Sequence, residues 1–478
     1  MQVVWFKRDL RISDHRPLFE AALRDGPVVP LFIVEEEILQ APDSSALHWD
    51  FQRAALHDLD RQLRALGAPL IIRQGEAVAV LEEIRRDHGI AHLWAHEETG
   101  NGITYARDRR VRRWARDSGV PFTEFPQNGV VRRLKSRDGW SQLWEKRMAE
   151  GVTPTPVYLP PHGLATVALE PAAAARATRR DAQETLESFL AGRGLRYTRE
   201  MSSPVSAEMS CSRLSEYLAW GLCSMREVVQ QTRHRAARLA SEAAPEAKLW
   251  RQSLRSFDAR LHWHCHFMQK LEDEPRIEFE NMVRAYDGLR EGEFCRERFE
   301  AWKQGRTGFP FIDACMRYLV ANGWINFRMR AMLVSFASYD LWLHWREPAL
   351  YLAQLFRDYE PGIHYSQFQM QSGTTGINTL RMYNPTKQGI DQDPDGSFIR
   401  RWVPELAGEP EVHQPRRPTV DHVAAVAYAR KRLGEIRRLD SSRTEARSVA
   451  QRHGSRKRTP GRRPRTTPPA EQGTLFGD

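Results

Sequence analysis

The sequence VVPLFIV at residues 28–34 is a short run of apolar and β-branched residues, a pattern typical of a buried strand. Four similar runs lie around it, at Val3–Phe6, Pro69–Arg73, His92–His96 and Pro121–Phe125. Because the intervals between these runs are long enough for a helix, their pattern decides the fold of the N-terminal part of the chain.

Amphipathic stretches of helix length separate the β-rich runs, for example Leu47–Leu66, Val78–Asp87 and Tyr105–Asp117. Strands that alternate with helices predict a doubly wound parallel sheet, so we expect an α/β domain over residues 1–131. No G-x-G-x-x-G sequence follows the first strand, and a dinucleotide is therefore not required at that position.

The chain becomes irregular after the α/β pattern. It holds a Pro-rich segment at residues 152–163 and an Ala-rich segment at residues 169–180. Proline and the loss of apolar periodicity disfavour regular structure, so we expect an interdomain linker with one helix over residues 132–195.

A mostly α-helical domain is predicted over residues 196–440. Apolar residues there recur at a period of 3.6, for example at Leu214, Leu218 and Leu222. Eight of the fourteen tryptophans lie between Trp220 and Trp402, and large aromatic side chains of this kind fill helical cores.

Composition excludes several classes of protein. A chain of 478 residues with 41% hydrophobic and 28% charged residues has room for two or three globular domains. It has no apolar run long enough for a signal peptide or a spanning helix, so we expect no membrane partner. The five cysteines form no C-x-x-C pair, which disfavours a disulfide framework and indicates a reducing compartment, the bacterial cytosol.

The last segment, residues 441–478, is rich in Arg, Pro and Thr and holds nine Lys and Arg against three Asp and Glu. We expect a disordered basic tail, which favours an acidic partner. Near its end, Gln472, Leu475 and Phe476 resemble the Q-x-x-L-F pentapeptide with which bacterial repair and replication proteins bind the sliding clamp. A tail without any partner is the alternative interpretation.

Two motifs have a functional and a structural interpretation. Residues 210–215 place hydroxyls and an arginine before an amphipathic run, which is either an anion site at a helix N-terminus or an ordinary serine cap. His262 and His266 share one helix face in Leu-His-Trp-His-Cys-His. Two ligands are too few for a metal site, so we predict none.

A third constellation combines Arg328 and Arg330 with Trp342 and Trp345, followed by the acidic segment 358–360. One interpretation is a solvated network of ion pairs. The other is a polar wall around a planar cofactor that needs both donors and acceptors.

Four ordered motifs resemble the photolyase/cryptochrome family of light-driven flavoproteins over residues 1–406. They are the opening VWFKRDLRISDH, Ser-Arg-Leu-Ser at 212–215 with Tyr-Leu-Ala at 217–219, GRTGFP at 305–310 with DACMR at 313–317, and Asn-Pro-Thr at 384–386 with FIRRWVPEL at 398–406. The resemblance implies an N-terminal antenna domain and a helical domain that binds FAD. It also implies damaged DNA as the partner, because photolyases flip a lesion out of the duplex against the flavin.

The resemblance assigns expected roles by position. Trp263 is expected to line the lesion pocket, and Trp302 and Trp345 to relay electrons to the flavin. The residues expected to hold FAD are Tyr197, Cys211, Ser212, Arg213, Leu214, Ser215, Arg260, His264, Asn326, Arg330, Asp358, Tyr359 and Glu360.

Departures from the family pattern concern the lesion pocket and the electron route. Arg260 stands where photolyases of cyclobutane dimers carry a glutamate, His264 replaces an arginine and Phe327 an asparagine. In an alignment with the family, the tryptophan expected nearest the flavin corresponds to Phe368 if a gap is allowed and to Ser366 if it is not. The residue beside the reactive flavin nitrogen is His364 with the gap and Gly362 without it. We therefore expect flavin photoreduction to be slow or to use another aromatic side chain.

The leading interpretation is a deoxyribodipyrimidine photolyase that splits cyclobutane pyrimidine dimers by electron transfer from excited FADH⁻. The alternative is a cryptochrome-type photoreceptor, in which a partner reads the flavin redox state. The sequence does not identify an antenna pigment of folate or flavin type, although Glu97 and Glu98 at the end of a strand are candidate contacts for a folate.

Overall fold

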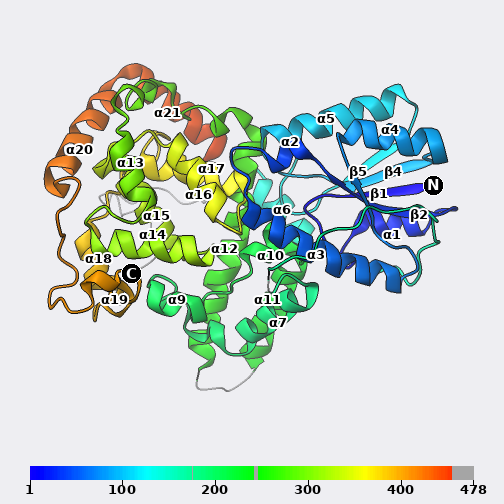
Figure 1. The fold of residues 1–478 in the computed structure, drawn as a ribbon, viewed down its shortest axis with the longest axis horizontal. Helices are drawn as coiled ribbons and strands as arrows, with labels where there is room; N and C mark the ends of the chain where they lie inside the picture. Colours follow the sequence, from blue (N-terminus) through cyan, green and yellow to red (C-terminus); the bar gives the residue numbers. More distant parts are fainter. Residues whose placement is uncertain (175, 242–245, 455–478) are drawn as a thin grey trace, which may run out of the picture.

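The computed structural model describes residues 1–174, 176–241 and 246–454, which form a parallel sheet beside a larger helical assembly (Figure 1). The strands are β1 (Gln2–Phe6), β2 (Val28–Val34), β3 (Ile71–Gln74), β4 (His92–His96) and β5 (Phe122–Phe125). They pair in the order β3-β2-β1-β4-β5, and every pair is parallel. The predicted doubly wound sheet is confirmed, because the strand order runs outward from β1 in both directions.

Alternate residues of β1 point into two separate cores. Val4 and Phe6 pack with residues of α1 (Arg16–Ala22) and α3 (Ala46–Ala65). Val3 and Trp5 pack on the other face with α4 (Ala77–His88) and α5 (Gly102–Asp117). This alternation follows from the two-residue period of a strand, and it explains why β1 and β2 are almost continuously apolar.

The remaining described residues are mostly helical. Their helices are α2 (Glu36–Leu39), α6 (Trp140–Ala149), α7 (Arg179–Ala191), α8 (Tyr197–Glu200), α9 (Pro204–Ser210), α10 (Ser215–Ala219), α11 (Met225–Ser241), α12 (Ala247–Asp273), α13 (Arg296–Lys303), α14 (Pro310–Asn322), α15 (Phe327–Ser335), α16 (Arg346–Leu355), α17 (Pro361–Ser372), α18 (Pro385–Gln392), α19 (Ser397–Trp402), α20 (His422–Arg438) and α21 (Asp440–His453). Short 3₁₀ turns and one π-helical turn at Phe336–Asp340 connect several of them. Within the described ranges, none of the helices combines the length and the apolar character needed to cross a bilayer.

The segment expected as a linker with one helix contains two. Helix α6 buries Trp140, Trp144 and Met148, spaced four residues apart on one face, and packs against α11. Helix α7 begins with a capping box between Thr178 and Asp181. The Pro-rich segment between the two helices hid this pattern in the sequence.

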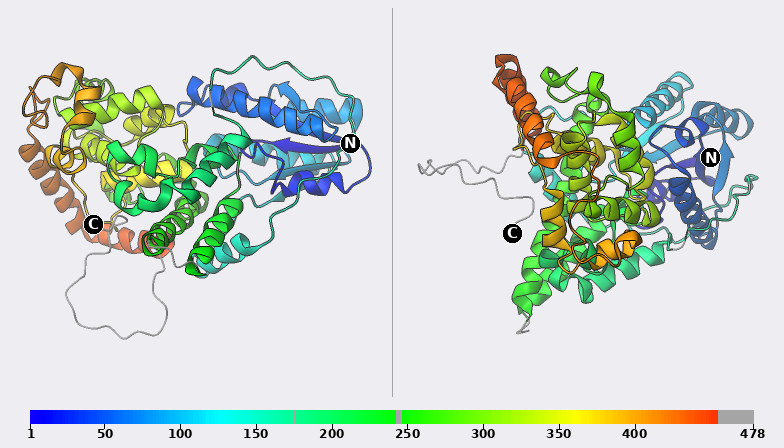
Figure 2. Two further views of the ribbon diagram at one scale, coloured as in Figure 1. Left: turned by 90° about the horizontal axis from the view of Figure 1, so that it is seen from below. Right: turned by 60° about the vertical axis from the view of Figure 1, so that its left-hand side comes forward.

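The expectation of a disordered tail from residue 441 is wrong for its first part. Helix α21 runs to His453, where the imidazole hydrogen-bonds the Glu274 carboxylate at the end of α12. Val449 is buried in the same contact region, near the 3₁₀ turn Arg284–Tyr286. The buried Val449 side chain and the buried hydrogen bond between His453 and Glu274 therefore help to hold a segment whose composition is largely polar. Helix α20 lies on the side of the helical part that faces away from the sheet (Figures 1 and 2).

The carboxyl end of β1 docks the sheet onto the helical part. Arg8 donates from Nε to the Ala219 carbonyl at 2.9 Å and from Nη2 to the Tyr359 carbonyl at 2.5 Å. Arg11 donates to the Gly221 carbonyl at 3.0 Å. The charged residues that end the first apolar run therefore fix two distant segments of the helical part at the edge of the sheet.

A buried hydrogen-bonded cluster organises the same loop. The Asp9 carboxylate oxygen Oδ2 lies 2.9 Å from His15 Nε2 and 2.8 Å from His96 Nδ1, and Asp9 Oδ1 accepts the Lys7 amide at 2.7 Å. Burial alone would raise the pKa of Asp9, but the two histidines outweigh it and hold this pKa well below its usual value. His15 also caps α1, because its Nδ1 accepts the amide of Leu18.

The docking contact leaves no space for a side chain at Gly221. This residue has φ +73°, and a Cβ there would fall against the backbone of Arg8 and Asp9. Gly288 has φ +77° but open space around its Cβ position, so it is a matched control. We expect Gly221→Ala to lower the free energy of unfolding by about 1–3 kcal/mol more than Gly288→Ala, the cost of overpacking alone. Urea unfolding of both variants measures this difference, and equal losses would contradict the tight docking.

Candidate functional site

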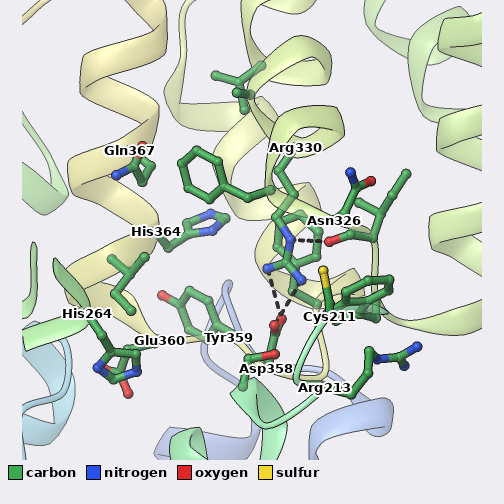
Figure 3. Close-up of a pocket in the computed structure, with 18 of the residues that line it drawn as sticks. Cys211, Arg213, His264, Asn326, Arg330, Asp358, Tyr359, Glu360, His364 and Gln367 are labelled. Carbon is green, nitrogen blue, oxygen red and sulfur yellow. Dashed lines mark hydrogen bonds and ion pairs between the residues drawn. The ribbon is translucent and has the colours of Figure 1, made fainter. Parts of the chain in front are cut away.

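The helical part encloses a deep pocket that opens between α10, α12, α15 and α17 (Figure 3). Its polar lining comes from segments that lie far apart in the sequence, and an apolar wall covers the opposite side. The lining residues are Tyr197, Cys211, Ser212, Arg213, Ser215, His264, Trp324, Ile325, Asn326, Phe327, Arg330, Ala331, Val334, Phe356, Asp358, Tyr359, Glu360, Ile363, His364, Gln367, Phe368 and Gln371.

A bidentate ion pair crosses the middle of the pocket. Arg330 Nη1 and Nη2 lie 3.0 and 2.8 Å from the two carboxylate oxygens of Asp358, and Arg330 Nε donates to the Ile325 carbonyl at 2.7 Å (Figure 3). Burial alone would raise the pKa of Asp358, but the guanidinium outweighs it and holds the pKa below its usual value. The pair therefore stays charged and keeps Arg330 in one orientation.

Arg213 lies at the rim in a strained conformation. Its φ of +59° is in the left-handed region, which is uncommon for any residue other than glycine. The guanidinium lies over the Trp324 ring, 4.0 Å from the centroid. Strained backbone of this kind is common at functional sites, and here it occurs at a cation of the pocket lining immediately before α10.

Burial shifts four other ionisable groups of the pocket toward their neutral forms. Burial raises the pKa of Glu360 to about 7, and Arg8, at 3.8 Å, only partly offsets this effect. Burial lowers the pKa values of His264 and His364 to about 4. Burial also raises the pKa of the Cys211 thiol to about 12. Apart from the Arg330–Asp358 pair and the Arg213 cation, the pocket thus presents donors and acceptors whose charged forms burial disfavours.

Several buried polar atoms of the pocket have no hydrogen-bond partner among the described residues. They are His264 Nδ1, Asn326 Oδ1, both amide atoms of Gln367, and Gln371 Nε2. Leaving such an atom unpaired costs about 1–3 kcal/mol, so a set of them around one cavity indicates a ligand with a polar edge. These donors and acceptors fit the heteroatoms of a flavin nucleotide, and the Arg213 guanidinium fits its phosphates.

Most of the residues that the sequence singled out meet in this pocket. The structure places Tyr197, Cys211, Ser212, Arg213, Ser215, His264, Asn326, Arg330, Asp358, Tyr359 and Glu360 in its lining. The segment at residues 210–215 does precede a helix, but α10 begins at Ser215 and has only five residues. Their roles toward a ligand remain predictions.

Five predicted residues lie outside the pocket lining as far as the described residues show. Leu214 is buried in the hydrophobic core, and Arg260 on α12 directs Nη2 toward the Met201 sulfur at 3.4 Å. Trp302 and Trp345 are buried in the core of the helical part. Trp263 lines a separate cavity with Trp140, His262, His266 and Gly454. His264, the next residue of α12, lines the pocket instead.

The two sequence alignments left open at α17 are distinguished by position. His364 and Phe368 line the pocket. Ser366 is directed instead toward the Phe267 carbonyl, at 3.3 Å, and a Cβ on Gly362 would meet the Met268 backbone. The side chain at the inner end of the pocket is therefore the hydrocarbon ring of Phe368.

Sequence reasoning missed part of the pocket wall. Ile363, Gln367 and Gln371 face the cavity from α17, and Val334 and Phe356 complete the apolar side. The signal was present, because residues 363, 367 and 371 recur every four positions on one helix face. Glutamines at this spacing are typical of a solvent-facing helix surface, yet the Gln371 side chain is only 2% exposed.

The fold and the pocket together define a flavin-nucleotide-binding protein built from an α/β unit and a helical unit. Residues 257–451 match the family described as the FAD binding domain of DNA photolyase, and residues 2–139 match the family described as DNA photolyase. The chain belongs to the DNA photolyase family, which includes the cryptochromes.

Individual relatives agree with this assignment. A deoxyribodipyrimidine photo-lyase of Streptomyces griseus is 30% identical over 481 residues, which cover 92% of this chain and 99% of the relative. A cryptochrome DASH of Gloeobacter violaceus is 28% identical, with 86% and 88% of the two chains covered. The crystal structure of an archaeal photolyase from Sulfolobus tokodaii with two FAD molecules is similar with a TM-score of 0.75 and 25% identity, over 91% and 99% of the two chains.

The raised pKa of Glu360 predicts a pH-dependent stability. Between pH 4.5 and 7 the folded state keeps a proton that the unfolded state has released, so stability falls as the pH rises through this window. Glu360→Gln replaces the titratable carboxyl group with a neutral amide, so this pH dependence is lost. We expect the variant to gain about 3 kcal/mol relative to the parent protein between pH 4.5 and 8. Denaturant unfolding of both flavin-free proteins at several pH values measures this gain. A constant difference in the free energy of unfolding between variant and parent at all pH values would contradict it.

Proposed function

We propose that this chain is a light-driven deoxyribodipyrimidine photolyase that binds FAD in the pocket and splits cyclobutane pyrimidine dimers in DNA. The observation that carries the proposal is the set of buried, unpaired polar atoms around the pocket, in a chain whose family is DNA photolyase. Bound FAD would supply light absorption and one-electron chemistry that no protein side chain supplies.

The residues of the chain have definable tasks in this function. Asp358 fixes Arg330, so that the guanidinium presents a rigid cation to the ligand. Gln367, Gln371 and Asn326 orient the ligand by hydrogen bonds, and the apolar wall excludes water from it. A protonated Glu360 can donate a hydrogen bond near pH 7 without placing a second negative charge beside Asp358.

Two of the three lesion-pocket departures from the family pattern lie in the pocket, whereas Arg260 lies outside its lining. His264 and Phe327 both line the pocket. Because burial lowers the pKa of His264 to about 4, its ring is neutral and can either donate or accept a hydrogen bond. A neutral histidine and a phenylalanine suit a flipped-out thymine dimer, which has carbonyl acceptors and an apolar face.

We further propose a second chromophore as antenna, which one structural relative suggests by holding two FAD molecules. Glu98 is not a free contact for it, because its carboxylate pairs with Arg107 at 2.5 Å. Glu97 is half-buried at the end of β4, and burial raises its pKa to about 7. We place the activity in the bacterial cytosol, in keeping with five free cysteines among the described residues.

Illumination of the reduced holoprotein tests the proposed function. We expect dimer-containing oligonucleotides to regain the absorbance of thymine under near-ultraviolet or blue light, after the flavin has been reduced chemically. The same mixture in the dark and an undamaged oligonucleotide are the controls. A protein that binds FAD but leaves the dimers intact would be a photoreceptor of the cryptochrome type instead.

The sliding clamp is the second proposed partner, through Gln472, Leu475 and Phe476, which lie outside the described residues. We expect replacement of Leu475 and Phe476 by alanine to weaken binding to a bacterial clamp by about tenfold or more, since the two apolar side chains would be the anchors. Calorimetry with purified clamp measures this, and unchanged binding, or none in the parent protein, would reject the partner.

A further inference from the structure

The pocket lacks an easily oxidised side chain at Phe368 but has one at Tyr359. Tyr359 lines the pocket between Asp358 and Glu360 (Figure 3). Its hydroxyl donates a hydrogen bond of 2.5 Å to Oδ2 of Asp43, which lies between α2 and α3. A phenol that touches both the cofactor pocket and a carboxylate can give up an electron and a proton together.

A second tyrosine shares the same carboxylate oxygen. Tyr365 on α17 donates to Asp43 Oδ2 at 3.1 Å, and its ring centroid lies 6.5 Å from that of Tyr359. Asn101 also donates to this oxygen at 2.9 Å. Asp43 is 4% exposed and Tyr365 is fully buried, so these polar groups interact only with one another and with their protein surroundings.

The arrangement continues away from the pocket. The Trp345 ring lies 6.5 Å from that of Tyr365, and its indole nitrogen donates to Asn281 Oδ1 at 2.8 Å. Tyr365 is therefore a ring neighbour of both Tyr359, which lines the pocket, and Trp345, each at a centroid separation of 6.5 Å.

Burial and the neighbouring oxygen acceptors raise the pKa values of both tyrosines above the usual value. Both phenols therefore stay protonated at physiological pH. Loss of an electron makes a phenol strongly acidic, so a buried tyrosine is oxidised readily only when a base already holds its proton in a hydrogen bond. His48 stacks on Tyr359 but is directed to the Phe356 carbonyl, which leaves Asp43 as the positioned acceptor.

We propose that Tyr359, Tyr365 and Asp43 form a proton-coupled electron donor that reduces the photoexcited, oxidised flavin in this pocket. This inference rests on the proposed binding of FAD. Tyr359 is the donor in contact with the cofactor, Asp43 is the proton acceptor, and Tyr365 is a positioning and second donor residue. The set replaces the readily oxidised side chain that position 368 lacks.

The step balances in electrons and protons. Tyr359 loses one electron to the excited flavin, and its phenolic proton moves to Asp43 Oδ2, which leaves a neutral tyrosyl radical and a neutral carboxylic acid. Tyr365 can then pass an electron to Tyr359 while Asp43 returns one proton to Tyr359 and takes another from Tyr365. A thiol in solution supplies the electron that restores the phenol, and the last proton returns from Asp43.

Radical spectroscopy on the holoprotein identifies the donor. We expect frozen samples illuminated in the oxidised state to show a tyrosyl signal by electron paramagnetic resonance, and deuteration of the tyrosine β-carbons to narrow it. Tyr359→Phe removes the signal. Asp43→Asn keeps the shape of the side chain but removes the proton acceptor, so we expect photoreduction with thiol present to slow by about 100-fold.

Tyr286→Phe is the matched control. Tyr286 is as buried as Tyr365, and its hydroxyl has no hydrogen-bond partner among the described residues, so this variant should photoreduce like the parent protein. A tryptophanyl signal alone, no photoreduction in the parent protein, or unchanged photoreduction in both Tyr359→Phe and Asp43→Asn would overturn the proposal. If Asp43→Asn does not fold, the effect of tyrosine deuteration on the radical signal of the parent protein still shows whether the donor is a tyrosine.

Chemical reduction separates this inference from the proposed function. Tyr365→Phe and Asp43→Asn, once reduced with dithionite, should repair dimers as fast as the parent protein, because the relay acts before repair. If the reduced parent protein fails to repair while the tyrosyl signal is present, the photolyase function is rejected and the relay remains.

Discussion

The docking of Arg8 onto the helical part is the contact on which the pocket depends. One guanidinium reaches the carbonyls of Ala219 and Tyr359 and lies 3.8 Å from the Glu360 carboxylate. The segment 358–360 supplies the acidic floor of the pocket, so its position is fixed by a residue that follows the first strand of the sheet. The α/β unit is therefore a structural component of the cofactor site as well as a neighbour of it.

The electrostatics of the pocket follow from burial in the same contact. Desolvation drives Glu360, His264 and His364 toward their neutral forms, whereas Asp358 stays ionised because a guanidinium grips both of its oxygens. A cavity with one fixed ion pair, unpaired polar atoms and the Arg213 cation favours a large ligand with an uncharged polar edge and an anionic end. This is the balance that a flavin nucleotide requires.

Sequence patterns predicted the sheet closely, since β2 and β4 have the expected bounds and strand alternation depends on local residue order. They also predicted many of the pocket-lining residues, because short motifs identify functional residues even when these lie far apart in the sequence. They failed where an outcome depends on long-range packing. Trp263 lines a separate cavity while His264, the next residue of α12, lines the pocket, and α21 contacts Glu274, almost 180 residues away. The glutamines of α17 were missed because their burial comes from other elements.

Asp43 belongs to the N-terminal unit, whereas both tyrosines that it binds belong to the helical unit. Together with Arg8, it makes the two units interdependent at the level of single side chains. Recombination between distant members of the family is constrained accordingly. In a chimera that joins the α/β unit of one relative to the helical unit of another, the residues at positions 8 and 43 have to match those at 359, 360 and 365 for these contacts to form. Crossovers that separate these positions put the contacts between the two units at risk.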